Sequence, residues 1–203
     1  MLRGPEFAII QAMSTLIGTI ALALVVLVVG WLALTYNRLI GLRNRLRAAW
    51  GDVDALLKRR ADLIPNLVEA VRGYMGHEER TLTRVTTARA NALMAGGAPD
   101  NTAGRAHAEN LLTSGMRQLF AVVENYPQLK ANENVMRLQE ELTGTEDRIA
   151  SSRGFYNETV RVFNTRIQSF PTNLVAGMLG FRSREFFATG DDAEREPVKV
   201  DLR

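Results

Sequence analysis

Residues 7–37 carry no charged side chain, and this stretch limits what the chain can fold into more than any other feature. A helix needs about 20 apolar residues to cross a bilayer, and residues 16–34 are apolar on every face. A cleaved signal peptide has a shorter apolar region, about 7–15 residues, followed by a small-x-small cleavage site. Here the longer run leads into residues 35–37 without such a site. The sequence therefore predicts a retained signal anchor within residues 1–35.

Arginines close to the apolar stretch bear on the side of the membrane that the rest of the chain occupies. Only Arg3 precedes the stretch, whereas a group of arginines follows it closely: Arg38, Arg43, Arg45 and Arg47. The positive-inside rule then favours a single-pass protein with a cytoplasmic body. The same arginines belong to an amphipathic helix, so solubility is an alternative reason for their presence.

The composition restricts the function classes of the remaining chain. Residues 36–187 are enough for one domain, and residues 188–203 read as a polar tail. The chain has no cysteine, which excludes disulfides, thiolate chemistry and cysteine-ligated metal. The net charge of +3 comes from interspersed arginines and carboxylates rather than from a basic stripe with aromatics. Nucleic acid is therefore not a predicted partner.

Apolar residues after the anchor recur at alternating steps of three and four, which is the heptad pattern of a helix packed at a shallow angle. The predicted seam is Leu39, Leu42, Leu46, Ala49, Val53, Leu56, Leu63, Leu67, Ala70 and Tyr74. Arg60 occupies the one place in this series that is not apolar. Pro65 lies inside the pattern and deprives the Ala61 carbonyl of its helical partner, so a kink near Ala61 is expected.

Three further helices are expected, over residues 77–95, 102–125 and 133–170. Residues 96–101 form the strongest helix breaker, and Asn132 suits the N-cap of the last helix. The predicted fold class is all-α. An N-terminal transmembrane helix is followed by an antiparallel four-helix bundle, whose first and last helices are long and coiled-coil-like.

The segment after Pro171 has two interpretations that the sequence leaves equal. Its apolar side chains, Leu174, Met178 and Phe181, can fold back and cap the bundle. Alternatively, this apolar face, together with Arg182 and Arg184, docks on a membrane surface or on a neighbouring subunit.

Long strings of this sequence resemble the LemA family. The strings include residues 36–39, 59–67, 129–134, 138–146 and 170–171, and within them lie Asp62, Pro65, Asn66, Asn132 and Asn134. The resemblance implies a helical bundle anchored in a bacterial inner membrane, without an established activity. Some relatives look like lipoproteins, with a cysteine before the residues that match Tyr36 and Asn37 and with domains outside the cytoplasm. This chain lacks that cysteine.

Signatures of enzymes and cofactor sites are mostly absent from the sequence. His77 and Glu78 begin like a zinc-protease motif, but Thr81 takes the place of the second histidine, and His107 has no partner at ligand spacing. No phosphate-binding glycine loop occurs. The sequence therefore predicts no metal and no cofactor.

A polar cluster of Arg59, Arg60, Asp62 and Asn66 is more informative. A charge on a helix seam is costly unless it is paired. We interpret Arg60 as the partner of an acid from the last helix, Glu141 or Glu146, which fixes helix register. A ligand site at this cluster is the less favoured alternative.

A long helical rod tied to the bilayer, without an assembled catalytic group, predicts a non-enzymatic membrane scaffold that forms homo-oligomers. Small residues Thr15, Thr19 and Ala23 offer a further helix contact within the bilayer. The first alternative is an adaptor that binds another membrane protein, such as a protease or signalling protein. An enzyme that uses the arginine-rich region is a more remote alternative.

Overall fold

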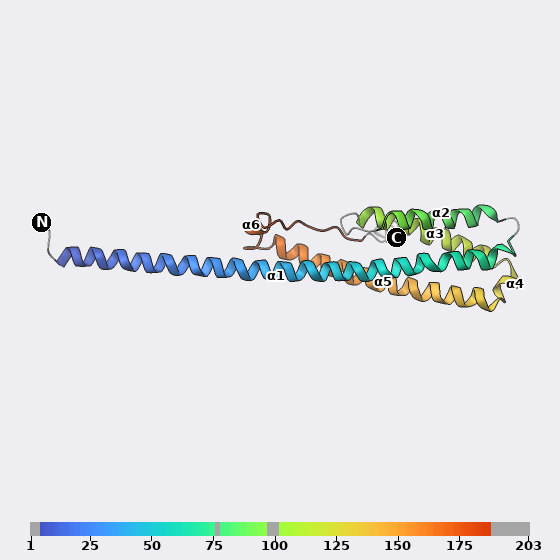
Figure 1. Cartoon of the computed structure of the whole chain (residues 1–203), viewed down its shortest axis with the longest axis horizontal. Coiled ribbons are helices and arrows are strands. Elements are labelled where there is room, and N and C mark those ends of the chain that lie inside the picture. Colours follow the sequence, from blue (N-terminus) through green and yellow to red (C-terminus); the bar gives the residue numbers. More distant parts are fainter. Residues whose placement is uncertain (1–4, 76–77, 97–101, 188–203) are drawn as a thin grey trace, which may run out of the picture.

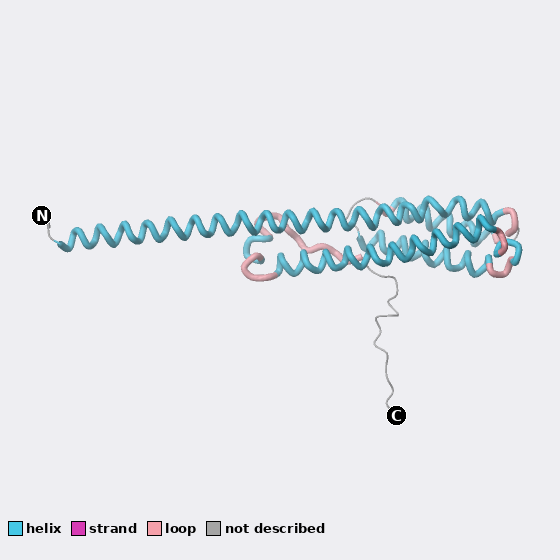
Figure 2. The backbone as a smooth tube through the Cα atoms, turned by 90° about the horizontal axis from the view of Figure 1, so that it is seen from below, coloured by secondary structure: helices cyan, strands magenta, loops and turns pink. Residues whose placement is uncertain are grey.

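The computed structural model describes residues 5–75, 78–96 and 102–187, with side chains from residue 9 onward, and over these ranges the chain forms helices and no strand (Figures 1 and 2). The helices are α1 (Pro5–Arg72), α2 (Glu79–Met94), α3 (Thr102–Val123), α4 (Pro127–Lys130), α5 (Glu133–Gln168) and α6 (Asn173–Ala176). The all-α class and the long apolar N-terminal helix are confirmed. Three predictions fall outside the described residues: the start at His77, most of the breaker and the tail 188–203.

Helix α1 is a single helix of 68 residues that joins the apolar stretch to the folded part of the chain. Its apolar portion is long enough to cross a membrane and is not buried against any other part of the chain. Trp31 and Leu32 are half-buried and Thr35 is buried, so the folded body reaches back to this turn of α1. The bare portion and the body are thus parts of one rod (Figure 1).

The body is built on the pairing of α1 with α5, which run antiparallel along one another (Figures 1 and 2). Helix α2 packs against α3 and against α1. Helices α2 and α3 lie along the half of the body farthest from the N-terminus. One apolar core lies among these helices, around Leu67, Leu112 and Leu142. A second core lies in the near half, among α1, α5 and an extended segment, residues 181–187, and Ala106 at the start of α3 also belongs to it.

The buried stripe of α1 departs from the predicted heptad seam in its second half. Leu56 and Leu63 are only half-buried and Tyr74 is 45% exposed, whereas the buried positions shift to Leu57 and Ile64. An α-helix drifts about 20° per heptad relative to a strict 3.5-residue repeat, so a straight helix turns its heptad stripe away from the core.

The last helix ends earlier than its apolar pattern predicts. Its seam is buried at most places from Val135 through Ile167, but α5 ends at Gln168 and Phe170 is 80% exposed. Phe170 therefore lies beyond the helix and outside the core.

Pro65 does not interrupt α1, and a neighbouring side chain explains why this is tolerated. Proline has no N–H to donate to the carbonyl four residues earlier, which here belongs to Ala61. The Nε of Arg89, from α2, donates a hydrogen bond of 2.6 Å to the Ala61 carbonyl oxygen. An arginine of the second helix thus takes the place of the missing backbone donor.

We expect Arg89→Ala to lower the free energy of unfolding by roughly 1.5–3 kcal/mol, because the half-buried carbonyl loses a charged donor. In a Pro65→Ala background the same change should cost much less, since the substituted alanine supplies its own backbone N–H to the Ala61 carbonyl. Urea unfolding of the full-length protein in detergent, followed by circular dichroism, measures both. Arg80→Ala, at an exposed position of α2, is the matched control. Equal losses in the two backgrounds would contradict this role of Arg89.

Candidate functional site

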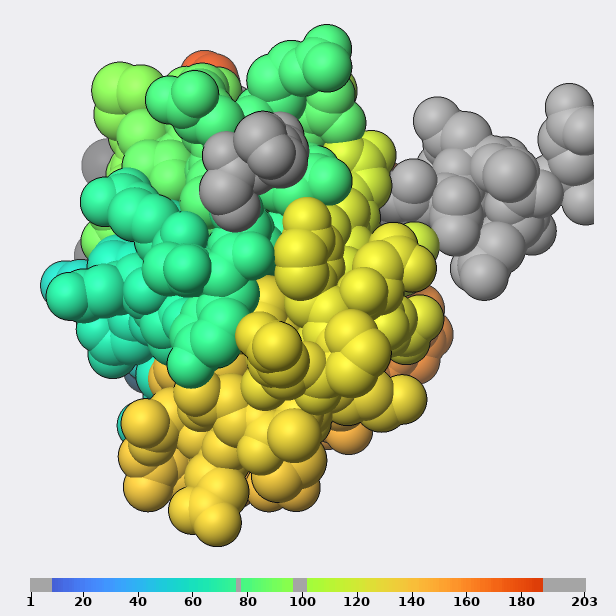
Figure 3. Space-filling model, turned by 90° about the vertical axis from the view of Figure 1, so that its right-hand side faces the viewer, coloured from blue at the N-terminus to red at the C-terminus, as the bar shows by residue number. Residues whose placement is uncertain are grey.

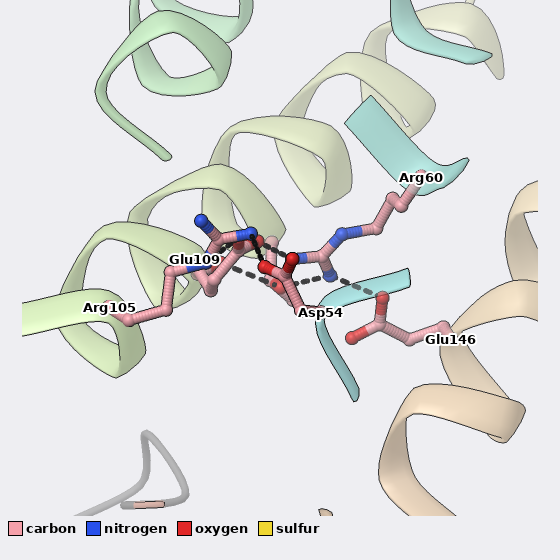
Figure 4. A network of polar contacts seen from close by, with 6 residues as sticks. Asp54, Arg60, Arg105, Glu109 and Glu146 are labelled. Carbon is pink, nitrogen blue, oxygen red and sulfur yellow. Dashed lines mark hydrogen bonds and ion pairs between the residues drawn. The ribbon is translucent and has the colours of Figure 1, made fainter. Parts of the chain in front are cut away.

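Arg60 lies in the interior where α1, α3 and α5 meet, and its side chain has no exposed surface. It donates to a carboxylate oxygen of Glu109 on α3 and to one of Glu146 on α5 (Figure 4). A further bond of 3.0 Å runs from its Nη1 to the Thr113 hydroxyl. One guanidinium therefore joins three helices.

Glu109 is the second buried centre of this cluster. Its side chain is 1% exposed, and its Oε1 lies 2.8 Å from the Nε of Arg105, one turn earlier on α3. Arg105 also lies 3.4 Å from Asp54 of α1. We call Asp54, Arg60, Arg105, Glu109 and Glu146 the buried ion-pair network (Figure 4).

Arg153 of α5 adds a further positive charge close to this network. Burial, and after it the nearby charge of Arg60, lowers the pKa of the Arg153 guanidinium, while Glu146 and Glu109 act in the opposite direction. Its guanidinium carbon lies 4.5 Å from the centre of the Phe187 ring, in a cation–π contact. The three arginines share one buried carboxylate, that of Glu109, whereas Glu146 and Asp54 are 38% and 39% exposed.

The structure gives Arg60 one of its two predicted partners. Glu146 contacts it, whereas Glu141 contacts Arg59 instead, at 2.5 Å and on the surface. Glu109 was not predicted, although a sequence signal was present. It falls on the same three-and-four spacing as the buried Leu112 and Met116, in the same way as Arg60 does on α1.

The other polar candidates lie at or near the surface. Asp62 and Pro65 are exposed. Asn66 and Asn134 line the same shallow depression between α1 and α5. Asn132 is the N-cap of α5, and its Oδ1 accepts from the backbone N–H groups of residues 134 and 135 at 3.0 and 3.3 Å.

The far end of the body, opposite the apolar span, is closed by the connections between helices. Figure 3 looks onto this end and shows α1, α3 and α5 packed side by side there. Leu129 of α4 is buried beneath this end, in the core around Leu67 and Leu112. Helix α4 therefore seals the far core where α3 turns into α5.

A feature that the sequence did not reveal is the strap, which we define as the extended residues 181–187. Two asparagines, two turns apart on α5, hold it. Asn164 accepts from the Arg184 N–H and donates to the Arg184 carbonyl, both at 2.8 Å. Asn157 makes the same pair of bonds with Phe187, at 2.8 and 3.1 Å. The two amides act as a clamp on the strap backbone.

Aromatic side chains fix the two ends of the strap. The Phe181 ring lies 6.0 Å from Tyr36 and 6.4 Å from Phe163, and the Phe187 ring lies 6.0 Å from Trp50. Tyr156 donates from its hydroxyl to the Glu185 carbonyl at 3.3 Å, and burial raises the pKa of this phenol. The strap thus covers the near half of the α1–α5 pair.

The segment after Pro171 places its apolar side chains in two different environments. Phe181 is buried and caps the body, whereas Leu174 and Met178 are 64% and 88% exposed. Arg182 is exposed and Arg184 is half-buried. Gly180, with φ of 76°, adopts the left-handed conformation that turns the chain from α6 into the strap.

The charged side chains buried in the described residues contact one another across helices. No group of three or more His, Asp or Glu side chains among the described residues is arranged to hold a metal ion, and His107 is exposed. The buried carboxylates are occupied by arginines of the same chain. What the network can do is hold α1, α3 and α5 in one register.

Comparison with known proteins places the chain among relatives. A model of the LemA family matches residues 49–202, which include the whole network and the strap. The chain belongs to the LemA family. The match begins after the apolar span, so it concerns the body.

Several proteins are similar to this LemA-family chain at low identity. Magnetosome protein MamQ 2 of Paramagnetospirillum magneticum is 25% identical over 91% of this chain and 73% of its own length. Magnetosome protein MamQ of Magnetospirillum gryphiswaldense is 25% identical over 77% of this chain and 65% of its own length. Protein LemA of Metamycoplasma hominis is 28% identical over 81% of this chain and 73% of its own length.

Proposed function

We propose that this LemA-family protein is a non-enzymatic, single-pass scaffold of a bacterial inner membrane that self-associates through its helical body. The observation that carries the proposal is the continuity of α1, which runs from the apolar span into the body as one helix. A body on such a rod cannot swing freely. Each copy therefore presents the same faces at the same height above the bilayer.

Confinement to a plane favours contacts between such copies. Two anchored bodies meet at a much higher effective concentration than free proteins, so weak lateral contacts become productive. In the half of the body far from the membrane, we propose that α1, α2, α3 and α5 form an antiparallel four-helix bundle. The buried ion-pair network supports this arrangement, because it links α1, α3 and α5.

One lateral surface offers the chemistry for self-association. Phe155 and Val162, two turns apart on α5, are 63% and 41% exposed. Large apolar side chains at the same height on each copy suit a symmetric contact. For orientation, the arginines that follow the span support a cytoplasmic body.

The experiment is the mass of the full-length protein in nanodiscs and in detergent, measured by light scattering and checked by particle imaging. We expect a uniform assembly that Phe155→Asp combined with Val162→Asp breaks into smaller species. Met136→Asp is the matched control, since Met136 is an exposed apolar residue at the other end of α5. A monomer in every condition would overturn the scaffold and favour an adaptor for another membrane protein, which a pull-down then tests.

A further inference from the structure

Three large apolar side chains project from one end of the body. Phe170, Leu174 and Met178 are 80%, 64% and 88% exposed, and we call them the end patch. Phe170 lies in the turn after α5, and the other two are four residues apart in and just after α6. In both ribbon views, α6 and this turn form the end of the body that faces the N-terminus (Figures 1 and 2).

The position of the patch along α1 can be read from its neighbours. Phe181, five residues after Ala176, packs its ring 6.0 Å from Tyr36 of α1. The body first covers α1 at Trp31 and Leu32. The patch therefore lies beside the turns of α1 around residues 31–36.

The same turns of α1 mark the end of the apolar span. Residues 16–34 are apolar, and at 1.5 Å per residue they extend over roughly 28 Å, close to the thickness of the hydrocarbon core. The first charged residue after them is Arg38. Trp31 and Tyr36 are the amphipathic aromatics that membrane–water interfaces favour. The water boundary on this side thus falls at the level of the end patch.

The patch also contrasts with the rest of its own segment. Ala176 and Phe181 are buried against the body, so the segment already has its structural role as a cap. The side of the segment that faces away from the body exposes Leu174 and Met178, which do not contribute to this cap. Exposed Arg182, adjacent to Phe181, supplies a positive charge at the same level, which suits lipid headgroups.

From this placement we infer that the end patch is embedded in the interfacial layer of the bilayer, with lipid as its occupant. The body is then held at two places, by α1 within the membrane and by Phe170, Leu174 and Met178 at its surface. This inference does not depend on self-association, because a monomer with this structure places the same side chains at the same height.

The test uses single cysteines in the full-length protein, which has no cysteine of its own. A spin label is attached at Met178→Cys or at Leu174→Cys, and the protein is placed in nanodiscs of phosphatidylcholine and phosphatidylglycerol. Collision with oxygen, which concentrates in lipid, is compared with collision with a water-soluble nickel chelate. We expect label 178 to be several times more accessible to oxygen, relative to nickel, than label 136 in Met136→Cys.

Two reference positions set the scale. Val25→Cys, an exposed residue inside the apolar span, gives the value for lipid and verifies insertion, and Met136→Cys gives the value for water. An intermediate to lipid-like ratio at positions 174 and 178 supports the inference. A water-like ratio overturns it. Protection from both reagents, together with spin–spin coupling between copies, also overturns it, because the patch would then belong to a contact between subunits.

Discussion

Glu109→Leu is expected to lower the free energy of unfolding by about 3–5 kcal/mol, which is the cost of removing one partner of a buried ion pair. Glu109 contacts both Arg60 and Arg105 from a position that is 1% exposed, and leucine removes one carboxylate partner from each of these buried guanidiniums. For a chain of this size, the loss corresponds to a fall in Tm of roughly 6–20 °C. Thermal unfolding of the full-length protein in nanodiscs, followed by circular dichroism, measures it.

The control for this prediction is the neighbouring surface pair. Arg59 and Glu141 are 58% and 37% exposed, so Glu141→Leu should cost no more than about 1 kcal/mol. Replacing the three buried charges of the network together, with Arg60→Met, Arg105→Met and Glu109→Leu in one chain, should recover much of the lost stability, since apolar groups of similar volume often match a buried ion pair. If Glu109→Leu cost no more than Glu141→Leu, the network would not be what joins the helices.

The second large effect is expected from the asparagine clamp on the strap. Asn157→Ala with Asn164→Ala removes four hydrogen bonds to strap backbone groups, each worth about 1 kcal/mol. Opening of the strap should become at least about tenfold more frequent, because even 1.4 kcal/mol changes an equilibrium tenfold. Arg182 and Arg184 lie within the strap, so limited trypsin digestion measures the opening directly.

A matched substitution separates the clamp from a general loss of stability. Asn125 is an exposed asparagine whose side chain bonds within its own turn, to the Ala121 carbonyl. Asn125→Ala should leave trypsin cleavage at the strap unchanged. Cleavage of the double variant at the rate of the unaltered protein would show that aromatic packing, rather than the two amides, holds the strap.

The parts of this fold that depend on local patterns could be predicted from the sequence. The charge-free stretch predicted the long apolar helix, and Asn132 predicted the start of α5 to the residue. Arg60 stood out because a charge interrupted an apolar series. The need for an acid on the facing helix left Glu141 and Glu146 as candidates, and Glu146 is the partner.

The missed features depend on contacts between distant segments. Asn157 and Asn164 look like ordinary polar positions of a helix, and only the path of residues 181–187 gives them a role. Nothing in the sequence distinguishes Arg89 from the other arginines. Only the packing of α2 places it beside the Ala61 carbonyl, which Pro65 leaves without a backbone donor. The shift of the α1 stripe from Leu56 to Leu57 depends on how little the helix supercoils, which a residue pattern does not state.

Because α1 is uninterrupted, it also fixes the angle, about the helix axis, between its apolar portion and the body. In a helix each residue contributes a turn of roughly 100° and a rise of about 1.5 Å. Suppose one residue is inserted into α1 between Gly18 and Gly30. The body would then rotate by about 100° relative to the part of α1 that precedes the insertion. The number of residues in the apolar segment therefore fixes the direction in which the body faces relative to the start of α1.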